Sequence, residues 1–214
     1  MIGVMNKMKS VLISIQPKWC ELIVSGKKTV EVRKTRPKID TPFKCYIYET
    51  KALYKPNGSN YFFNGEGKVI GEFVCDEIIE FYEETLAHDE LDGNPVESWM
   101  MWNMSDNLCE VLHLYEMEDV ERCTCLTSAE ILSYLHPNMN GYGWHISDVV
   151  IYGKPKELSK YRTLCKGQYK DCRKCGNLLS EGCESTGFFE SCYFDGVIPL
   201  TRPPQSWCYV DSIE

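Results

Sequence analysis

The stretch SVLISIQPKWCELIVSGKKTVEVRK, Ser10 to Lys34, has the pattern of a strand, a helix and a second strand in direct succession. Ser10–Ile15 is a short run rich in β-forming residues. Pro17 suits the first turn of a helix, and the apolar residues that follow it recur at helical spacing. Gly26 stands where many helices end in a left-handed residue. The sequence therefore predicts a strand, a helix and a tight turn before the charged residues begin.

After this turn the pattern changes to a period of two. In a strand, Thr29, Glu31 and Arg33 share one face, and Val30 and Val32 share the opposite, buried face. The simplest interpretation of the two charged residues is a surface ion pair, which contributes about 0–1 kcal/mol. The alternative is that they line a binding site.

Positive charge is concentrated around this stretch. Eight Lys and Arg residues stand against three Asp and Glu residues between Lys18 and Lys44, although the whole chain has a net charge of −8. An acidic chain does not fit a protein that coats nucleic acid, because such binding needs many cationic contacts to phosphate. A local basic face instead favours a site for one anionic ligand.

Further strands are predicted at Lys44–Thr50, at 68–82 with Gly71 as a bulge or point of close approach, and at Gly141–Tyr152. The intervening segment 83–140 is acidic and mostly helical in pattern. Several strands, few helices and no βαβ repeat predict an α+β fold around a small antiparallel β-barrel.

Cysteines mark the region after residue 160. A CRKC turn suits two thiolates on one zinc ion, and the expected ligands are Cys165, Cys172 and Cys175 with Cys183 or Cys192 as the fourth. The competing interpretation is that these are incidental thiols. With twelve cysteines, no export signal and no apolar run long enough to span a membrane, we expect a cytoplasmic, reducing location and a structural zinc.

Four ordered segments resemble the ASCH domain, the activating signal cointegrator homology module: SIQPKWCELIVSGKKTVEVRK, YIYET, GKVIGEFVCDEI and YGWHISD. The resemblance covers roughly residues 10 to 155. It implies a PUA-like small antiparallel β-barrel with flanking helices. The expected organisation is an N-terminal extension (1–9), an ASCH domain (10–158) with the helical insertion (83–140), a zinc-binding segment (159–196), and a C-terminal strand that packs back on the domain (197–214).

The resemblance also implies a cleft that binds RNA or a nucleotide-like ligand. Its core is the pattern Gly-x-Lys-x-x-Glu-x-Arg, which here supplies a lysine, a carboxylate and an arginine. An aromatic residue offers a stacking face, and a C-terminal TRPPQSW motif offers an arginine and an amide for a base edge. The expected ligand-binding residues are Lys28, Glu31, Arg33, Trp19, His145, Arg202 and Gln205.

Two other functions stay open. One branch of the family hydrolyses N4-acylcytidine with a lysine, a threonine and a glutamate, and another cleaves RNA. Lys28 matches the lysine, but Glu31 stands at the threonine position, so a catalytic role for this pair would need Glu31 to act as a base on water. The third possibility is a protein-interaction module that recruits a partner through the acidic helical segment.

Overall fold

The computed structural model describes residues 10–54, 62–85, 97–103, 117–137, 140–164 and 197–211. Its helices are α2 (Pro17–Val24), α3 (Met117–Thr124), α4 (Ser128–Leu135) and a 3₁₀ turn, η1 (Leu158–Lys160). Its strands are β1 (Ser10–Ile15), β2 (Val30–Arg33), β3 (Phe43–Glu49), β4 (Ala52–Tyr54), β5 (Phe62–Asn64), β6 (Lys68–Cys75), β7 (Ile78–Thr85), β8 (Glu97–Asn103), β9 (Gly141–His145), β10 (Ser147–Lys156), β11 (Arg162–Leu164), β12 (Val197–Pro199) and β13 (Trp207–Val210).

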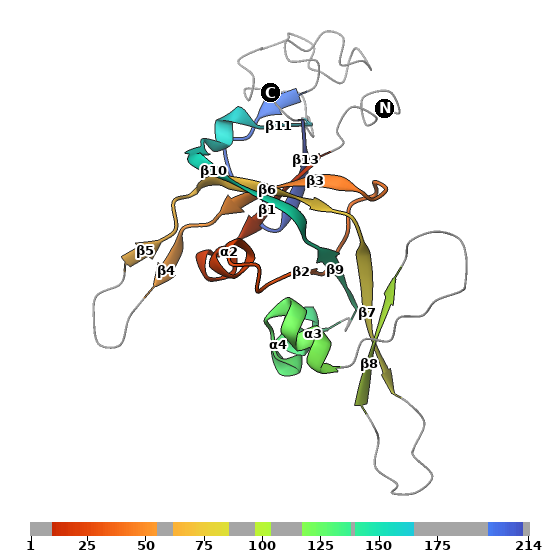
Figure 1. Cartoon of the computed structure of the whole chain (residues 1–214). Coiled ribbons are helices and arrows are strands. Elements are labelled where there is room, and N and C mark those ends of the chain that lie inside the picture. The colour runs from red at the N-terminus through yellow and green to blue at the C-terminus, as the bar shows by residue number, and fades with distance from the viewer. Residues whose placement is uncertain are drawn as a thin grey trace, which may run out of the picture.

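The larger sheet has five strands in the order β10-β6-β3-β1-β13 (Figure 1). β1 pairs in parallel with β3 and antiparallel with β13, and Ser10 lies opposite Val210 in the second pairing. The side chains of β1 alternate between two cores. Ile13 and its neighbours at odd positions pack with α2 on one face, and Leu12 packs on the other face with Tyr161 and Leu200. Every residue of β1 is therefore buried.

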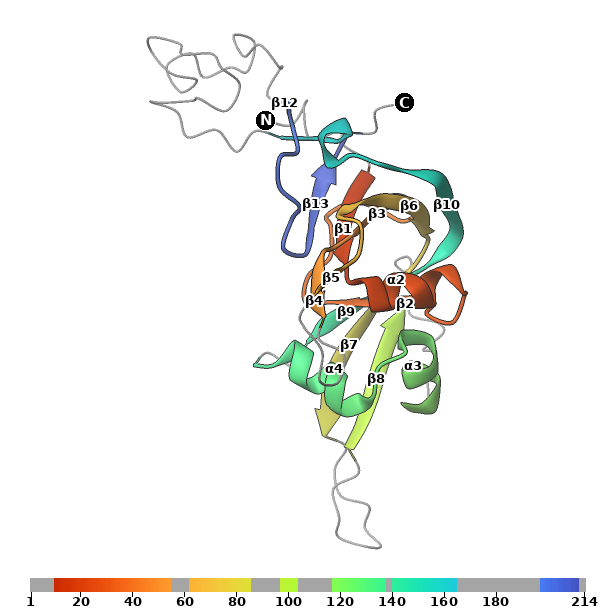
Figure 2. The same cartoon turned by 90° about the vertical axis from the view of Figure 1, so that its left-hand side faces the viewer.

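A second sheet, β2-β9-β7-β8, lies next to the first (Figure 2). Two of the connections between the sheets are very short: β6 leads into β7 across Asp76 and Glu77, and β9 leads into β10 across Ile146. The two crossings are joined, since the amide of His145 donates to the carbonyl of Glu77 at 3.0 Å. Val30 and Val32 of β2 pack against α3 and α4 in a separate apolar cluster. β2 is thus clamped between its sheet and these helices.

The prediction of an α+β fold is confirmed, as is the bulge at Gly71, where the β3–β6 register shifts. The small barrel is not shown: among the described strands both sheets are open, and the parallel β1–β3 pair makes the first of them mixed. The segment 83–140 differs from its helical expectation. Its described parts are the end of β7, all of β8, α3 and α4. β8 is a strand rather than a helix because it pairs with β7 in an antiparallel ladder.

No helix within the described ranges combines the length and the apolar character that a membrane crossing requires. The proposed zinc ligands Cys165, Cys172, Cys175, Cys183 and Cys192 lie outside the described residues. Among the residues that the structure describes, no cluster of three or more His, Cys, Asp or Glu side chains is placed to hold a metal ion.

Candidate functional site

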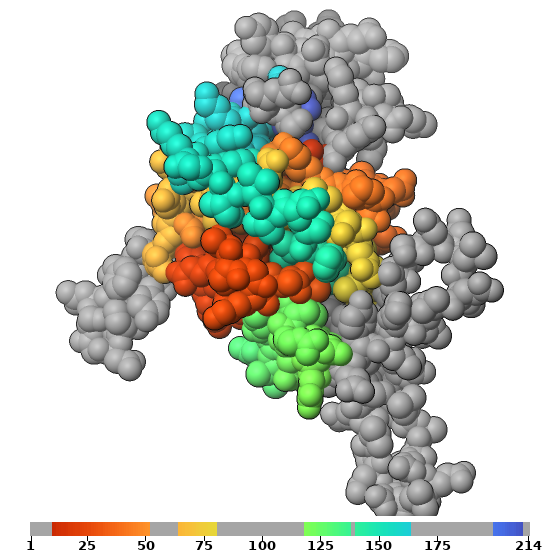
Figure 3. Space-filling view, viewed as in Figure 1, coloured from red at the N-terminus to blue at the C-terminus, as the bar shows by residue number. Residues whose placement is uncertain are grey.

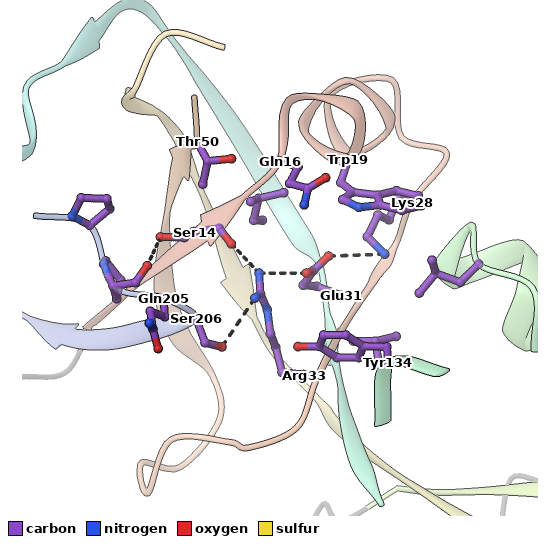
Figure 4. Close-up of a pocket in the computed structure, with 15 residues that line it drawn as sticks. Ser14, Gln16, Trp19, Lys28, Glu31, Arg33, Thr50, Tyr134, Gln205 and Ser206 are labelled. Atoms are coloured by element: carbon purple, nitrogen blue, oxygen red, sulfur yellow. Dashed lines mark hydrogen bonds and ion pairs between the residues drawn. The ribbon is translucent and has the colours of Figure 1, made fainter. Parts of the chain in front are cut away.

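A cavity of about 610 Å³ opens where α2, β2, α4 and the segment before β13 meet. In the space-filling view, α2 and the residues after it, coloured red, meet α3 and α4, coloured green (Figure 3). The charged side chains of Lys28, Glu31 and Arg33 are joined by ion pairs in the lining, and the Trp19 ring lies next to Lys28 (Figure 4). The lining residues are Ser14, Ile15, Gln16, Trp19, Lys28, Glu31, Val32, Arg33, Thr50, Leu126, Tyr134, Pro203, Pro204, Gln205 and Ser206.

Lys28 reaches this cavity from the turn after α2. Gly26 adopts a φ of 71°, as its place at the helix end requires, and β2 begins only at Val30. Lys28 is therefore not bound by the alternation of the strand. Its ammonium group donates to the carbonyls of Val30 (2.9 Å) and Thr124 (2.6 Å), and the residue is 2% exposed. These bonds tie the end of α3 to the start of β2.

Glu31 lies between two cations. Its Oε1 is 2.9 Å from Nη2 of Arg33, and its Oε2 is 3.3 Å from Nζ of Lys28. Arg33 also donates from Nη2 to the carbonyl of Ser14 at 2.7 Å. Glu31 and Arg33 are 6% and 7% exposed, so the interpretation as a surface ion pair is wrong. Breaking a buried cluster of this kind leaves an uncompensated charge, which is strongly destabilising.

The cluster leaves polar atoms without hydrogen-bond partners. Oε2 of Glu31 forms an ion pair with Lys28 at 3.3 Å and accepts no hydrogen bond from the described residues. Nε of Arg33 is buried and also has no acceptor. Buried polar atoms normally have partners in the protein, in water or in a ligand. Both atoms are themselves buried, so the ion pairs with Lys28 and within the cluster, rather than hydrogen bonds, compensate the charge of Glu31.

Two aromatic side chains stand near the charged residues, Trp19 from α2 and Tyr134 from α4 (Figure 4). The ammonium group of an exposed lysine lies over each ring. Nζ of Lys18 is 4.1 Å from the centre of the Trp19 ring, and Nζ of Lys34 is 5.6 Å from the centre of the Tyr134 ring. The cavity therefore combines flat apolar surfaces with positive charge next to them, which is the combination that stacked bases and their phosphates use.

The segment before β13 forms the remaining wall. Oγ of Ser14 donates to the carbonyl of Pro204 at 2.7 Å, and the amide of Ser14 donates to the carbonyl of Ser206 at 2.9 Å. Nη1 of Arg33 lies 3.5 Å from Oγ of Ser206. These contacts hold Gln205 in the lining, whereas Arg202 is exposed and is not among the lining residues.

His145 lies apart from the cavity, at the crossing between the sheets. Its Nδ1 is 2.7 Å from Oδ1 of Asp76. Burial alone would raise the pKa of Asp76, but the hydrogen bond and the charge of His145 outweigh it and lower that pKa below its usual value. The pair thus joins the connection between β6 and β7 to the end of β9, which gives His145 a structural role. Thr29, whose hydroxyl the hydrolytic branch would need nearby, is not among the lining residues either.

The structure brings together five of the seven expected ligand-binding residues: Trp19, Lys28, Glu31, Arg33 and Gln205. Sequence reasoning missed Tyr134. It sits on α4 beside Leu135, away from the buried face of the helix, and is 39% exposed. An aromatic residue off the apolar stripe of an amphipathic helix is a signal that could have identified it.

Comparison with known proteins identifies the family of the chain. The family model described as the ASCH domain matches residues 13–131, more than half of the chain. The chain belongs to the ASCH-domain family. Similar solved structures include the crystal structure of ASCH from Zymomonas mobilis, which is 16% identical, with a TM-score of 0.47 and coverage of 94% of this chain and 87% of that one. Crystal structures of two mutants of the same ASCH protein have TM-scores of 0.47 and 0.43. Their identities are 16% and 19%, with coverage of 95% and 70% of this chain and 89% and 76% of theirs. No curated protein matches the sequence.

Proposed function

We propose that this ASCH domain binds RNA or a nucleotide-like ligand in the cavity described above. The observation that carries the proposal is the buried cluster of Lys28, Glu31 and Arg33, which lines a cavity together with Trp19 and Tyr134. A volume of about 610 Å³ falls in the range of small-molecule sites, roughly 300–1,000 Å³. It suits one or two nucleotides and does not suit a duplex.

The lining supplies what such a ligand needs. Trp19 and Tyr134 offer ring faces for a base, and Gln16 and Gln205 offer amides that both donate and accept hydrogen bonds. The excess of positive over negative charge in the cluster favours a ligand that carries acceptors. No contact in the described residues favours hydrolysis over binding, so we propose a binding function.

Trp19→Leu and Gln205→Ala are expected to weaken the binding of short single-stranded RNA or of nucleotides. Loss of one stacking face costs about 1–3 kcal/mol, which is roughly five- to 150-fold in Kd. Binding can be measured by titration calorimetry with short homopolymers and the four nucleoside monophosphates. Arg202→Ala and His145→Gln serve as controls, because both residues lie outside the lining, and they should leave Kd unchanged. If Trp19→Leu bound RNA and nucleotides with the same Kd as the unaltered protein, the proposal that they bind in this cavity would be contradicted.

The zinc site stays a proposal on the sequence pattern of Cys165, Cys172 and Cys175 with Cys183 or Cys192. Thiolate ligation goes with the reducing, cytoplasmic location that we propose for the chain. Metal analysis of protein purified under reducing conditions should give about one zinc per chain. Cys172→Ser with Cys175→Ser should remove it, whereas Cys20→Ser, a core substitution, should not. Protein that is folded and free of metal would exclude this site.

A further inference from the structure

We propose that this chain forms a two-fold symmetric homodimer in which β10 of one copy pairs in antiparallel fashion with β10 of a second copy. The inference goes beyond the proposed function and concerns a different surface, since none of the described residues that line the cavity belongs to β10. It rests on an open strand edge, on exposed apolar side chains and on two opposite charges at symmetric positions.

The strand edge comes from the position of β10 in its sheet. β10 is the last strand of the five-stranded sheet, and Figure 2 shows it at the outer end of that sheet. It pairs with β6 along one edge, and no other described strand pairs with the opposite edge. The backbone amides and carbonyls along such an edge can form a ladder with a strand from another molecule.

The middle of β10 exposes apolar side chains to water. Val149, Val150 and Ile151 are 38%, 51% and 42% exposed, and they are three of the five large hydrophobic residues that are exposed in the described chain. A strand paired along this edge would cover part of their surface, which favours association. An edge that stays free usually carries polar or charged side chains instead.

A two-fold axis at Ile151 gives these residues suitable partners. In an antiparallel ladder about this axis, each residue faces the one that lies equally far from Ile151 in the second copy. Val149 then faces Gly153, where an added Cβ would meet no atom of the described chain within 4 Å. The glycine therefore leaves room for the valine side chain, and the two copies of Ile151 face each other at the centre.

The same axis makes the charges complementary. Asp148 and Lys154 lie three residues before and three residues after Ile151, so each carboxylate faces an ammonium group of the second copy, twice per dimer. Both residues are exposed, and neither side chain forms an ion pair with another described residue. Opposite charges that face each other across two strands stabilise the pairing. A lysine alone would protect the edge, whereas a lysine matched by an acid at the symmetric position selects one register.

Two features keep the ladder short. Pro155 has no N–H group to donate, and the register of β10 against β6 shifts on both sides of Val150 and Ile151. A short ladder buries an area at the low end of specific interfaces. We therefore expect a reversible dimer with a Kd of about 1–100 µM.

Analytical ultracentrifugation of the full chain from about 1 µM to 1 mM should show a monomer–dimer equilibrium. Ile151→Glu places two carboxylates opposite each other at the axis and should raise the dimer Kd about tenfold or more. Because Ile151 is partly exposed, the variant should keep the circular dichroism spectrum of the unaltered protein. A chain that stays monomeric over this range, or a dimer that Ile151→Glu does not weaken, would overturn the proposal.

Charge reversal tests the register. Lys154→Glu and Asp148→Lys should each raise the dimer Kd about tenfold or more, because each places like charges face to face. An equimolar mixture of the two variants should dimerise about as well as the unaltered protein, because every facing pair in the mixed dimer is again of opposite sign. Circular dichroism checks that each variant is folded.

Lys156→Glu is the matched control, since it makes the same change of charge on the same strand. In this register Lys156 faces Ile146, an uncharged residue, so the dimer Kd should change less than about twofold. With the axis moved by one residue to Tyr152, Lys156 would face Asp148 instead. A mixture of the Lys154 and Asp148 variants that stays monomeric, or a Lys156→Glu effect as large as that of Lys154→Glu, would contradict the proposed pairing.

Discussion

Lys28→Met is expected to lower the free energy of unfolding by about 3–5 kcal/mol. The substitution keeps an unbranched side chain of similar length but removes the donor to the carbonyls of Val30 and Thr124, which then have no partner from this residue. It also removes one of the two cations that face Glu31. Urea denaturation followed by circular dichroism gives the change directly.

Lys27→Met is the matched control, because Lys27 is the preceding residue and is exposed. It should change the free energy of unfolding by less than about 0.5 kcal/mol. If both variants unfolded at the same urea concentration as the unaltered protein, the buried ammonium would not be holding α3 to β2. The contrast between two adjacent lysines makes the result independent of any general effect of charge.

Trp144→Ala is expected to cost about 3–5 kcal/mol as well, by a different mechanism. Trp144 is fully buried, packs edge-on against Phe43 at 5.8 Å between ring centres, and contacts Trp207 at 5.7 Å. It lies directly opposite Glu31 in the β2–β9 pairing. Truncation would leave a void in the core under the charged cluster, and the midpoint of thermal unfolding should fall accordingly.

Trp19→Leu provides the comparison, since Trp19 is only partly buried and lines the cavity. It should weaken ligand binding while changing the unfolding midpoint much less than Trp144→Ala. A small effect of Trp144→Ala on unfolding would mean that the packing between β3, β9 and β13 contributes little to stability.

The first strand, helix and second strand could be predicted because their signals are local. Pro17 and Gly26 mark the two ends of α2, and the alternation in VEVR places Glu31 and Arg33 on one face. The charge count around them predicted a site in the stretch whose residues Lys28, Glu31 and Arg33 line the cavity. All of this depends on residues that are neighbours in the chain, where propensity and periodicity are informative.

The remaining features depend on contacts between distant segments. The position of Lys28 follows from where β2 begins and from Thr124, 96 residues further on. The end of β7 and the whole of β8 were predicted as helix, because the acidic composition of 83–140 hid their pairing. His145 and Arg202 were expected at the cavity, but the pairing with Asp76 and the exposed bend after Leu200 place them elsewhere. Periodicity carries no information about such partners.

The hydrogen bond from Ser14 to Pro204 joins residues 190 positions apart, and it holds one wall of the cavity. During synthesis on the ribosome, the strand, helix and charged residues near the start emerge long before that wall exists. The nascent domain would therefore present a half-built, open groove until residues 203–206 have left the exit tunnel. The cavity would be complete only after translation has passed this point, and a shortened chain restricted to residues 13–131 would lack the wall altogether.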